Sequence, residues 1–177
     1  MTGAKKREIP LTLSQDKYRI ALLSAYAVGL HGLETLLPSP VPWLKFGLAN
    51  IITLITLMLY GFRAAMMVTL IRVLISSLLT GTFPGPAFFL SLGGGVVSTV
   101  AMATVLFSFP GLFSAVGLSL IGAFFHNMTQ LSLAYFLLIQ RIEPILFIAP
   151  LIMLLGTVTG LINGTVSELV IRHVKKS

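Results

Sequence analysis

The feature that most limits how this chain can fold is its long apolar runs without charge. From Gly111 to Ile139 there is no Asp, Glu, Lys or Arg. Over the whole chain 56% of residues are hydrophobic and 10% are charged, with a mean hydropathy of +0.98, whereas soluble domains carry about a quarter charged residues. So few charged residues cannot solvate the surface of a soluble globule. The sequence therefore predicts an all-α polytopic membrane protein.

The 177 residues have room for about six helical crossings of about 20 residues each. Clusters of turn-forming residues divide the apolar sequence into such segments. We place the spans at residues 18–37, 45–60, 62–80, 86–107, 112–138 and 145–170. The second is short enough to be tilted or partly interfacial. The predicted domains are a basic cytoplasmic tail over 1–17, a six-helix transmembrane domain over 18–172 and a second cytoplasmic tail over 173–177.

The positions of the basic residues predict the orientation, because cytoplasmic segments are enriched in Lys and Arg. With both termini in the cytoplasm, only Lys45 and Arg141 lie outside, and Arg72 lies within a span. The other nine basic residues lie inside: Lys5, Lys6, Arg7, Lys17, Arg19, Arg63, Arg172, Lys175 and Lys176. Basic residues that flank spans indicate membrane topology rather than nucleic-acid binding. The chain has no cysteine, which excludes disulfides, thiolate catalysis and Cys-ligated metals.

Polar side chains recur at similar depth in four of the predicted spans. On a helix, residues three or four apart share one side. The residues concerned are His31 and Glu34 in the first span, Lys45 and Asn50 in the second, Arg72 in the third, and His126, Asn127 and Gln130 in the fifth. We expect them to lie between the membrane centre and its outer surface, facing the interior of the helix bundle rather than lipid.

Arg72 has the highest cost of burial among these residues, because an Arg at mid-membrane is unfavourable by at least about 2.5–3.5 kcal/mol. One interpretation is a closed internal pair in which Glu34 neutralises Arg72. The other is a substrate pocket open to the outside. A single carboxylate faces both Arg72 and Lys45, which leaves a surplus cation, and a buried cation favours an anionic partner. The second interpretation predicts a ligand that carries phosphate, carboxylate or an acidic ring.

Small residues at four-residue spacing occur in the first and last spans. Such ladders let helix backbones approach closely within a membrane. In the last span, Gly156, Gly160 and Gly164 favour helix packing within the monomer. In the first, Ala21, Ala25 and Gly29 fit packing and docking of a partner membrane protein equally well.

Two further features concern the fourth and last spans. The "GGG" at 93–95 predicts that another backbone packs there or that the helix is broken near a cavity. Asn163 and Glu168 are expected to cap the last span or to reach the interface.

Several motifs together resemble a known family. They are "NIITL" (50–54) followed by the mid-span Arg72, "GTFPGPAFFLSLGGG" (81–95), "GAFFHNMTQ" (122–130) and "GTVTGLINGTVSELV" (156–170). In this combination the chain resembles the Gx transporter family, whose members are often labelled heptaprenyl diphosphate synthase component I. The resemblance covers nearly all of the chain after the N-terminal tail.

That family is similar to the substrate-binding S components of energy-coupling factor transporters. The resemblance implies a six-helix protein of the bacterial cytoplasmic membrane that binds a vitamin-like solute on its outer side. It also implies that the ladder of Ala21, Ala25 and Gly29 docks on a membrane coupling subunit driven by ATPases. The sequence has no G-x-x-x-x-G-K-[ST] loop of its own, so the energy for transport would come from a partner or a gradient.

The synthase label implies a different role, as a subunit of an enzyme that elongates prenyl diphosphates for menaquinone side chains. Such chemistry needs clustered carboxylates to hold magnesium. The chain has one Asp, Asp16, and four Glu residues isolated from one another. We therefore expect no catalytic residue, metal site or cofactor in this chain, and keep a non-catalytic accessory subunit, associated with a prenyl synthase, as the alternative. A third possibility is a membrane subunit of a redox or assembly complex with no transported solute.

Overall fold

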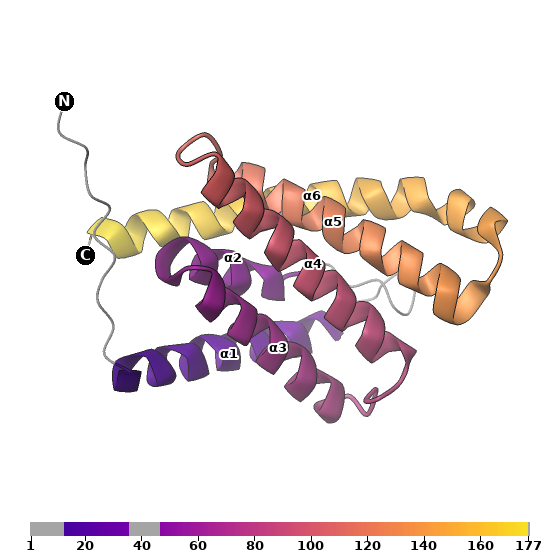
Figure 1. Ribbon diagram of the computed structural model, residues 1–177, viewed down its shortest axis with the longest axis horizontal. Helices are drawn as coiled ribbons and strands as arrows, with labels where there is room; N and C mark the ends of the chain where they lie inside the picture. The colour runs from indigo at the N-terminus through magenta and orange to yellow at the C-terminus, as the bar shows by residue number, and fades with distance from the viewer. Residues whose placement is uncertain (1–12, 36–46, 177) are drawn as a thin grey trace.

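The computed structural model describes residues 13–35 and 47–176 (Figure 1). Within these ranges the secondary structure is helical throughout, with short turns between the elements. The elements are α1 (Leu13–Thr35), α2 (Ala49–Tyr60), α3 (Phe62–Leu79), α4 (Pro86–Ser108), α5 (Ala115–Ala134), the π-helix η1 (Tyr135–Ile139) and α6 (Ile142–Lys176). The prediction of an all-helical fold with about six helices is confirmed.

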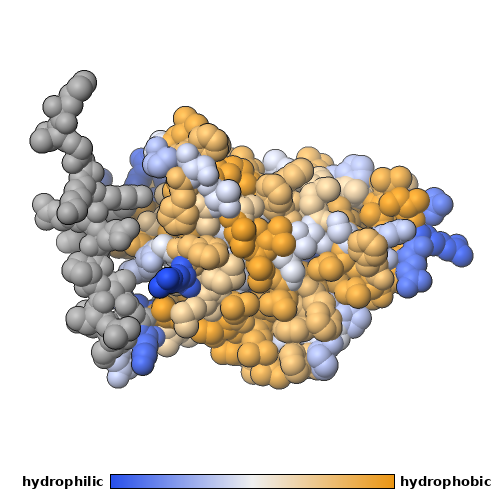
Figure 2. Space-filling view, viewed as in Figure 1, coloured by the Kyte–Doolittle hydropathy of each residue, from blue (hydrophilic) through white to orange (hydrophobic). Residues whose placement is uncertain are grey.

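Within the described residues, three helices are long and apolar enough to cross a membrane: α3, α4 and the part of α6 over Ile142–Val174. The shorter α2 is also apolar. The surface agrees with this composition. Figure 2 shows hydrophobic side chains over the middle of the visible face and hydrophilic ones toward its two ends. Large apolar side chains such as Leu79 and Phe147 are 74% and 89% exposed, as expected for residues that face lipid.

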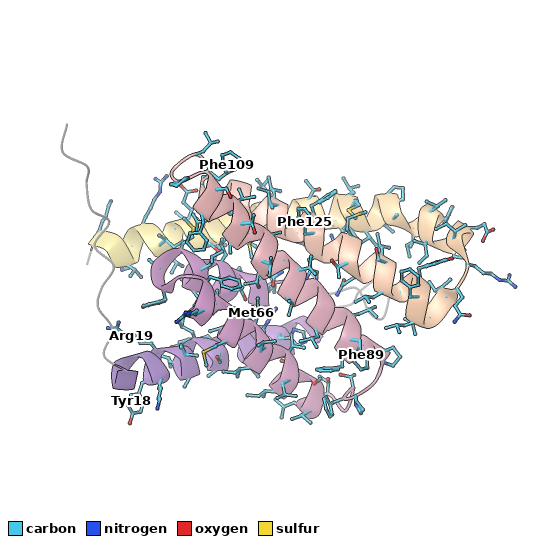
Figure 3. All side chains as sticks on the ribbon, in the orientation of Figure 1. Tyr18, Arg19, Met66, Phe89, Phe109 and Phe125 are labelled. Carbon is cyan, nitrogen blue, oxygen red and sulfur yellow. The ribbon has the colours of Figure 1, made fainter. Side chains whose placement is uncertain are left out.

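The helices form a bundle in which α5 packs along both α4 and α6, while α3 packs along α1 and α4. In Figure 1, α1 begins and α6 ends at the same end of the bundle, as the predicted even number of crossings would place them. Arg19 (Figure 3) lies near that end, with its guanidinium carbon 5.9 Å from the centroid of the Tyr60 ring. Which end faces the cytoplasm stays a prediction.

The short helix α2 begins inside the bundle. It has 12 residues, about 18 Å of helix, against 35 residues in α6. We predicted a span from residue 45, but the helix begins at Ala49, after Gly47, whose φ of 75° is in the left-handed region. Ala49, Thr53 and Leu54 are at most 1% exposed, so the first turns of α2 lie among the side chains of the other helices.

Two side chains of α6 hold these first turns of α2. Asn163 Nδ2 donates to the Gly47 carbonyl at 2.9 Å, and Ser167 Oγ donates to the Ile51 carbonyl at 3.4 Å. Asn163 is 4% exposed, so it does not reach the interface. Its amide bonds Gly47, which precedes α2, and not an end of α6, so the expectation that it caps the last span was wrong as well. Glu168 does reach the surface, where it pairs with Arg172.

The two small-residue ladders lie in different environments. Gly156, Gly160 and Gly164 are buried and face α5; a Cβ at Gly164 would lie 2.5 Å from Val116 Cα, which is backbone. On α1, by contrast, Ala21, Ala25 and Gly29 are exposed, and a Cβ at Gly29 would meet nothing within 4 Å. The ladder on α6 therefore packs within the monomer, while the ladder on α1 is left on the surface.

Candidate functional site

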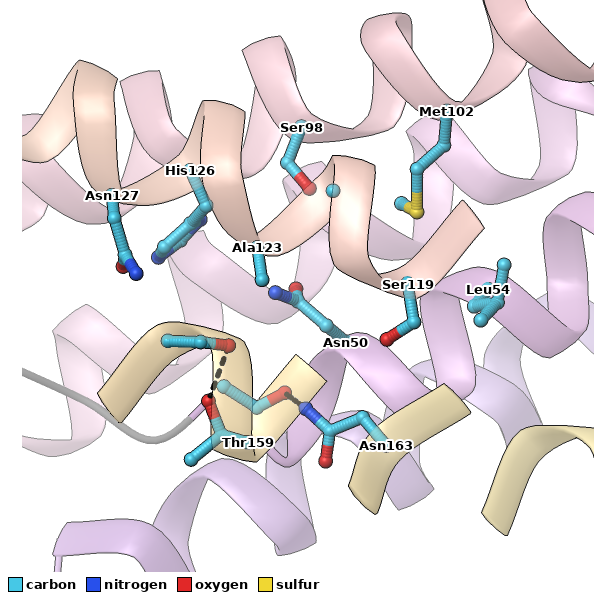
Figure 4. Close-up of a pocket in the computed structure, with 13 residues that line it drawn as sticks. Asn50, Leu54, Ser98, Met102, Ser119, Ala123, His126, Asn127, Thr159 and Asn163 are labelled. Atoms are coloured by element: carbon cyan, nitrogen blue, oxygen red, sulfur yellow. Dashed lines mark hydrogen bonds between the residues drawn. The ribbon is translucent and has the colours of Figure 1, made fainter. Parts of the chain in front are cut away.

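Two neighbouring cavities lie where α2 begins, and most of the predicted polar residues line them. The first, which we call the basic cavity, is lined by His31, Gly47, Arg72, Val73, Ser91, His126 and Gln130. The second, the amide cavity (Figure 4), is lined by Gly47, Asn50, Leu54, Ser98, Met102, Ser119, Gly122, Ala123, His126, Asn127, Gly156, Thr159 and Asn163. Gly47 and His126 line both. Each cavity has a volume of about 20 Å³, which is enough for a water molecule.

Arg72, on α3, is the Arg side chain that lines the basic cavity. Its side chain is 4% exposed, and its Nη2 donates to Asn50 Oδ1 on α2 at 3.3 Å. The side chains of His31, His126 and Gln130 are likewise less than 9% exposed. Among the described residues, no acidic side chain lines either cavity. The surroundings of Arg72 thus supply several hydrogen-bonding groups, and so far as the structure describes them these groups are uncharged or basic.

A chain of hydroxyl groups lies one turn from Arg72 and joins three helices. Thr69 Oγ1 is 3.3 Å from Thr53 Oγ1 and 3.1 Å from Thr99 Oγ1, and Thr99 donates to the Gly95 carbonyl at 2.8 Å. All three threonines are at most 1% exposed. Because these bonds run between α2, α3 and α4, they hold the helix that carries Arg72 in place relative to its neighbours.

The glycines of α4 allow the polar residues of the basic cavity to lie against its backbone. Neither expected arrangement of the "GGG" is observed: α4 continues through residues 93–95, and side chains rather than a second backbone pack there. A Cβ at Gly94 would lie 2.9 Å from the His126 ring, and one at Gly95 would lie 3.0 Å from Thr69 Cγ2 and 3.4 Å from Arg72 Nη2. A residue larger than glycine would therefore displace His126 at position 94 and Thr69, beside Arg72, at position 95.

We expect Gly94→Ala to weaken binding at this site by about tenfold, because the new methyl group must push His126 aside. Gly93→Ala is the matched control. Its Cβ would lie 2.5 Å from the end of the flexible Leu133 side chain, which can rotate away, and 3.5 Å from Thr129 Cγ2, an ordinary contact. Ala also favours the helix by about 1 kcal/mol over Gly. Thermal unfolding and ligand titration on both variants check this. Equal affinities in the two variants would contradict the role given to Gly94.

The other predicted site residues lie as follows. Asn127 lines the amide cavity, and its Nδ2 donates to the Ile152 carbonyl of α6 at 3.3 Å. A Cβ at Gly156 would collide with this amide group, so this glycine leaves room for it. Lys45 and the side chain of Glu34 lie outside the described residues. The predicted pair of Glu34 with Arg72 therefore falls outside them too.

Sequence reasoning missed Ser98, Ser119, Thr159 and Asn163, which line the amide cavity. For Asn163 there was a usable signal, because it lies three residues after Gly160 and so shares the helix face of the glycine ladder. Among the described residues, no group of three His, Cys, Asp or Glu side chains is placed to hold a metal ion.

Comparisons with known proteins agree with this architecture. The fold is similar to a solved S component of a bacterial ECF transporter, with a TM-score of 0.76 and 19% identity over 93% of this chain and 98% of that chain. No curated protein matches the chain in sequence. The model of one family, described as heptaprenyl diphosphate synthase component I, matches residues 23–170. The chain therefore belongs to the heptaprenyl diphosphate synthase component I family, as the sequence motifs predicted.

Proposed function

We propose that this protein is the solute-binding component of a membrane transport system and that its solute is a small anion. The observation that carries the proposal is the basic cavity, where buried Arg72 is surrounded by His31, His126 and Gln130. A guanidinium that is out of contact with water favours an anion beside it. The polar side chains beside Arg72 supply further hydrogen bonds to the same ligand.

The fold supports a transport role over an enzymatic one. The chain is similar in fold, though only 19% identical, to the S component of a bacterial ECF transporter. Because the sequence has no phosphate-binding loop for ATP, we infer that energy comes from a partner. The positive-inside rule places the end of the bundle near Lys17, Arg19 and Arg63 in the cytoplasm. The solute would then enter from the outer side.

The exposed ladder on α1 is the proposed docking face for a membrane coupling subunit. We expect a photo-crosslinker at Ala25 to capture such a subunit in native membranes, and Gly29→Leu to reduce the captured amount at least about tenfold, because a bulky side chain keeps two helices apart. Since a Cβ at Gly29 meets nothing within 4 Å, the variant should unfold at the wild-type temperature. Undiminished capture in Gly29→Leu would rule out this face.

The family description favours one alternative, a non-catalytic accessory subunit that positions an isoprenoid for a prenyl diphosphate synthase. The catalytic carboxylates would then belong to a soluble partner, because this chain has only one Asp and four separate Glu residues. Copurification with a prenyl synthase, together with a polyprenyl ligand, would favour this alternative.

The test of the proposal is to identify the ligand that the purified protein carries. Wild type, Arg72→Ala and His126→Ala are purified in detergent and denatured, and the released small molecules are compared by mass spectrometry. We expect a small anion in the wild type that is absent from both variants. A polyprenyl species would replace the proposal by the accessory role, and folded proteins that are all empty and bind no added anion would refute it.

A further inference from the structure

Polar side chains enter the amide cavity beside apolar ones. Among the described residues that line it, the apolar side chains are Leu54, Met102 and Ala123, and the others are glycine or polar. Figure 4 shows Asn50, Ser98 and Asn163 entering the space from three different helices, α2, α4 and α6. A groove for a prenyl chain would be lined mainly by large apolar side chains. The lining therefore points to a group that forms hydrogen bonds.

Two buried oxygens at this cavity have no hydrogen-bond partner among the described residues: Ser98 Oγ and Asn163 Oδ1. The residues are 1% and 4% exposed. The orientation of the Asn163 amide is set by its other atom, because Nδ2 donates to the Gly47 carbonyl. Its Oδ1 is therefore an acceptor that lacks a donor. Buried acceptors without donors are unfavourable, so a bound group with N–H or O–H would satisfy this oxygen.

The two cavities adjoin each other, so one solute can place a different group in each. Gly47 and His126 line both. Asn50 lines the amide cavity and accepts a hydrogen bond from Arg72, which lines the basic cavity. A solute whose anionic group lies at Arg72 therefore extends toward Ser98 and Asn163. The volume of about 20 Å³ at the amide cavity is enough for one hydroxyl or amino group of such a solute.

We propose that the amide cavity is a second subsite, in which Ser98 and Asn163 bind an uncharged N–H or O–H group of the solute. The inference rests on the proposed function and narrows its substrate class. The solute is a small polar anion with its own hydrogen-bond donors, such as an acidic nitrogen heterocycle or a polyhydroxy acid. A prenyl diphosphate does not belong to this class, because its tail has no donors.

The experiment uses the full chain in lipid nanodiscs and probes in matched sets. Each set holds an anion with donors, an anion of similar size without them, and a neutral molecule with donors. One set is orotate, benzoate and uracil, and another is shikimate, cyclohexene carboxylate and inositol. Inorganic phosphate and geranyl diphosphate complete the panel. Affinity is measured by calorimetry, and thermal unfolding reports whether each protein is folded.

The variant that isolates the subsite is Ser98→Ala. Because Ser98 Oγ has no partner among the described residues, its removal should leave the fold intact. Thr104→Ala is the matched control: it lies on the same helix, is exposed, and bonds only the Val100 carbonyl of its own helix. Asn163→Ala serves as a second probe of the subsite, although it also removes the bond to Gly47.

The expected result is that, in at least one set, the anion with donors binds wild type at least about tenfold more tightly than the anion without them. Ser98→Ala should reduce this ratio by about fivefold, and Thr104→Ala should leave it unchanged. If anions bind equally well with and without donors, or if geranyl diphosphate binds best, the subsite is refuted while an anion site remains. If no anion binds, including phosphate, the proposed function fails first and the inference with it.

Discussion

Replacing Arg72 by Gln is expected to lower the affinity for the anionic solute by about 100-fold. Arg72 is 4% exposed in the basic cavity, and a hydrogen bond to a charged group is worth about 1.5–3 kcal/mol, which corresponds to roughly 10- to 150-fold in affinity. Arg72→Lys retains the charge but loses the planar fork that binds an oxyanion through two N–H groups. We expect it to bind with intermediate affinity. Calorimetry with the solute recovered from the wild-type protein measures the affinities of wild type, Arg72→Gln and Arg72→Lys.

Arg63→Gln is the control for this series, because it is the same substitution on the same helix at an exposed position. It should bind like wild type. If Arg72→Gln binds the solute as tightly as Arg63→Gln does, the anion does not lie at Arg72. If Arg72→Gln unfolds, the folded Arg72→Lys still decides the question through its affinity.

Gly164→Val is expected to cause the largest loss of stability, about 3 kcal/mol or more. A Cβ at this position would lie 2.5 Å from Val116 Cα and 3.2 Å from the Ala115 carbonyl oxygen. Both atoms belong to the backbone, so no side chain can rotate away, and α5 and α6 must separate. Overpacking of a well-packed core usually costs about 1–3 kcal/mol, and contact with a helix backbone places this change at or above the upper limit. Thermal unfolding in detergent measures the effect.

Gly29→Val tests whether the loss is due to this contact rather than to the substitution itself. A Cβ at Gly29 meets nothing within 4 Å, so the stability of this variant should match wild type. If Gly29→Val and Gly164→Val lose similar amounts of stability, the loss comes from placing a β-branched residue in a helix. The close contact of α5 with α6 at Gly164 would then be contradicted.

The fold was predictable from the sequence because a membrane leaves few choices. Long apolar runs must become helices, and turn residues separate them, so six helices could be predicted from the apolar runs alone. The cluster around Arg72 was predictable for a related reason: the cost of polar groups in lipid directs them to the bundle interior. His31, His126 and Gln130 indeed line the same cavity as Arg72.

The amide cavity was not predictable, because it depends on how neighbouring helices are rotated and shifted against one another. Ser98 looks like any small residue of an apolar helix until the start of α2 and the face of α6 are placed beside it. The start of α2 was predicted four residues too early for the same reason. The apolar residues Phe46 and Leu48 precede the helix in the sequence, whereas the helix begins at Ala49, two residues after Gly47 with its φ of 75°.

The bonds from α6 to α2 also determine when the site is completed during synthesis. Asn163 and Ser167 each bond a backbone carbonyl that precedes them by 116 residues. At about 5–20 residues per second, a ribosome needs on the order of 10 s to add that length. During this interval α3, α4 and α5 are made, and the first turns of α2 lack their partners on α6. A nascent chain released before α6 would therefore contain Arg72 but not the complete amide cavity.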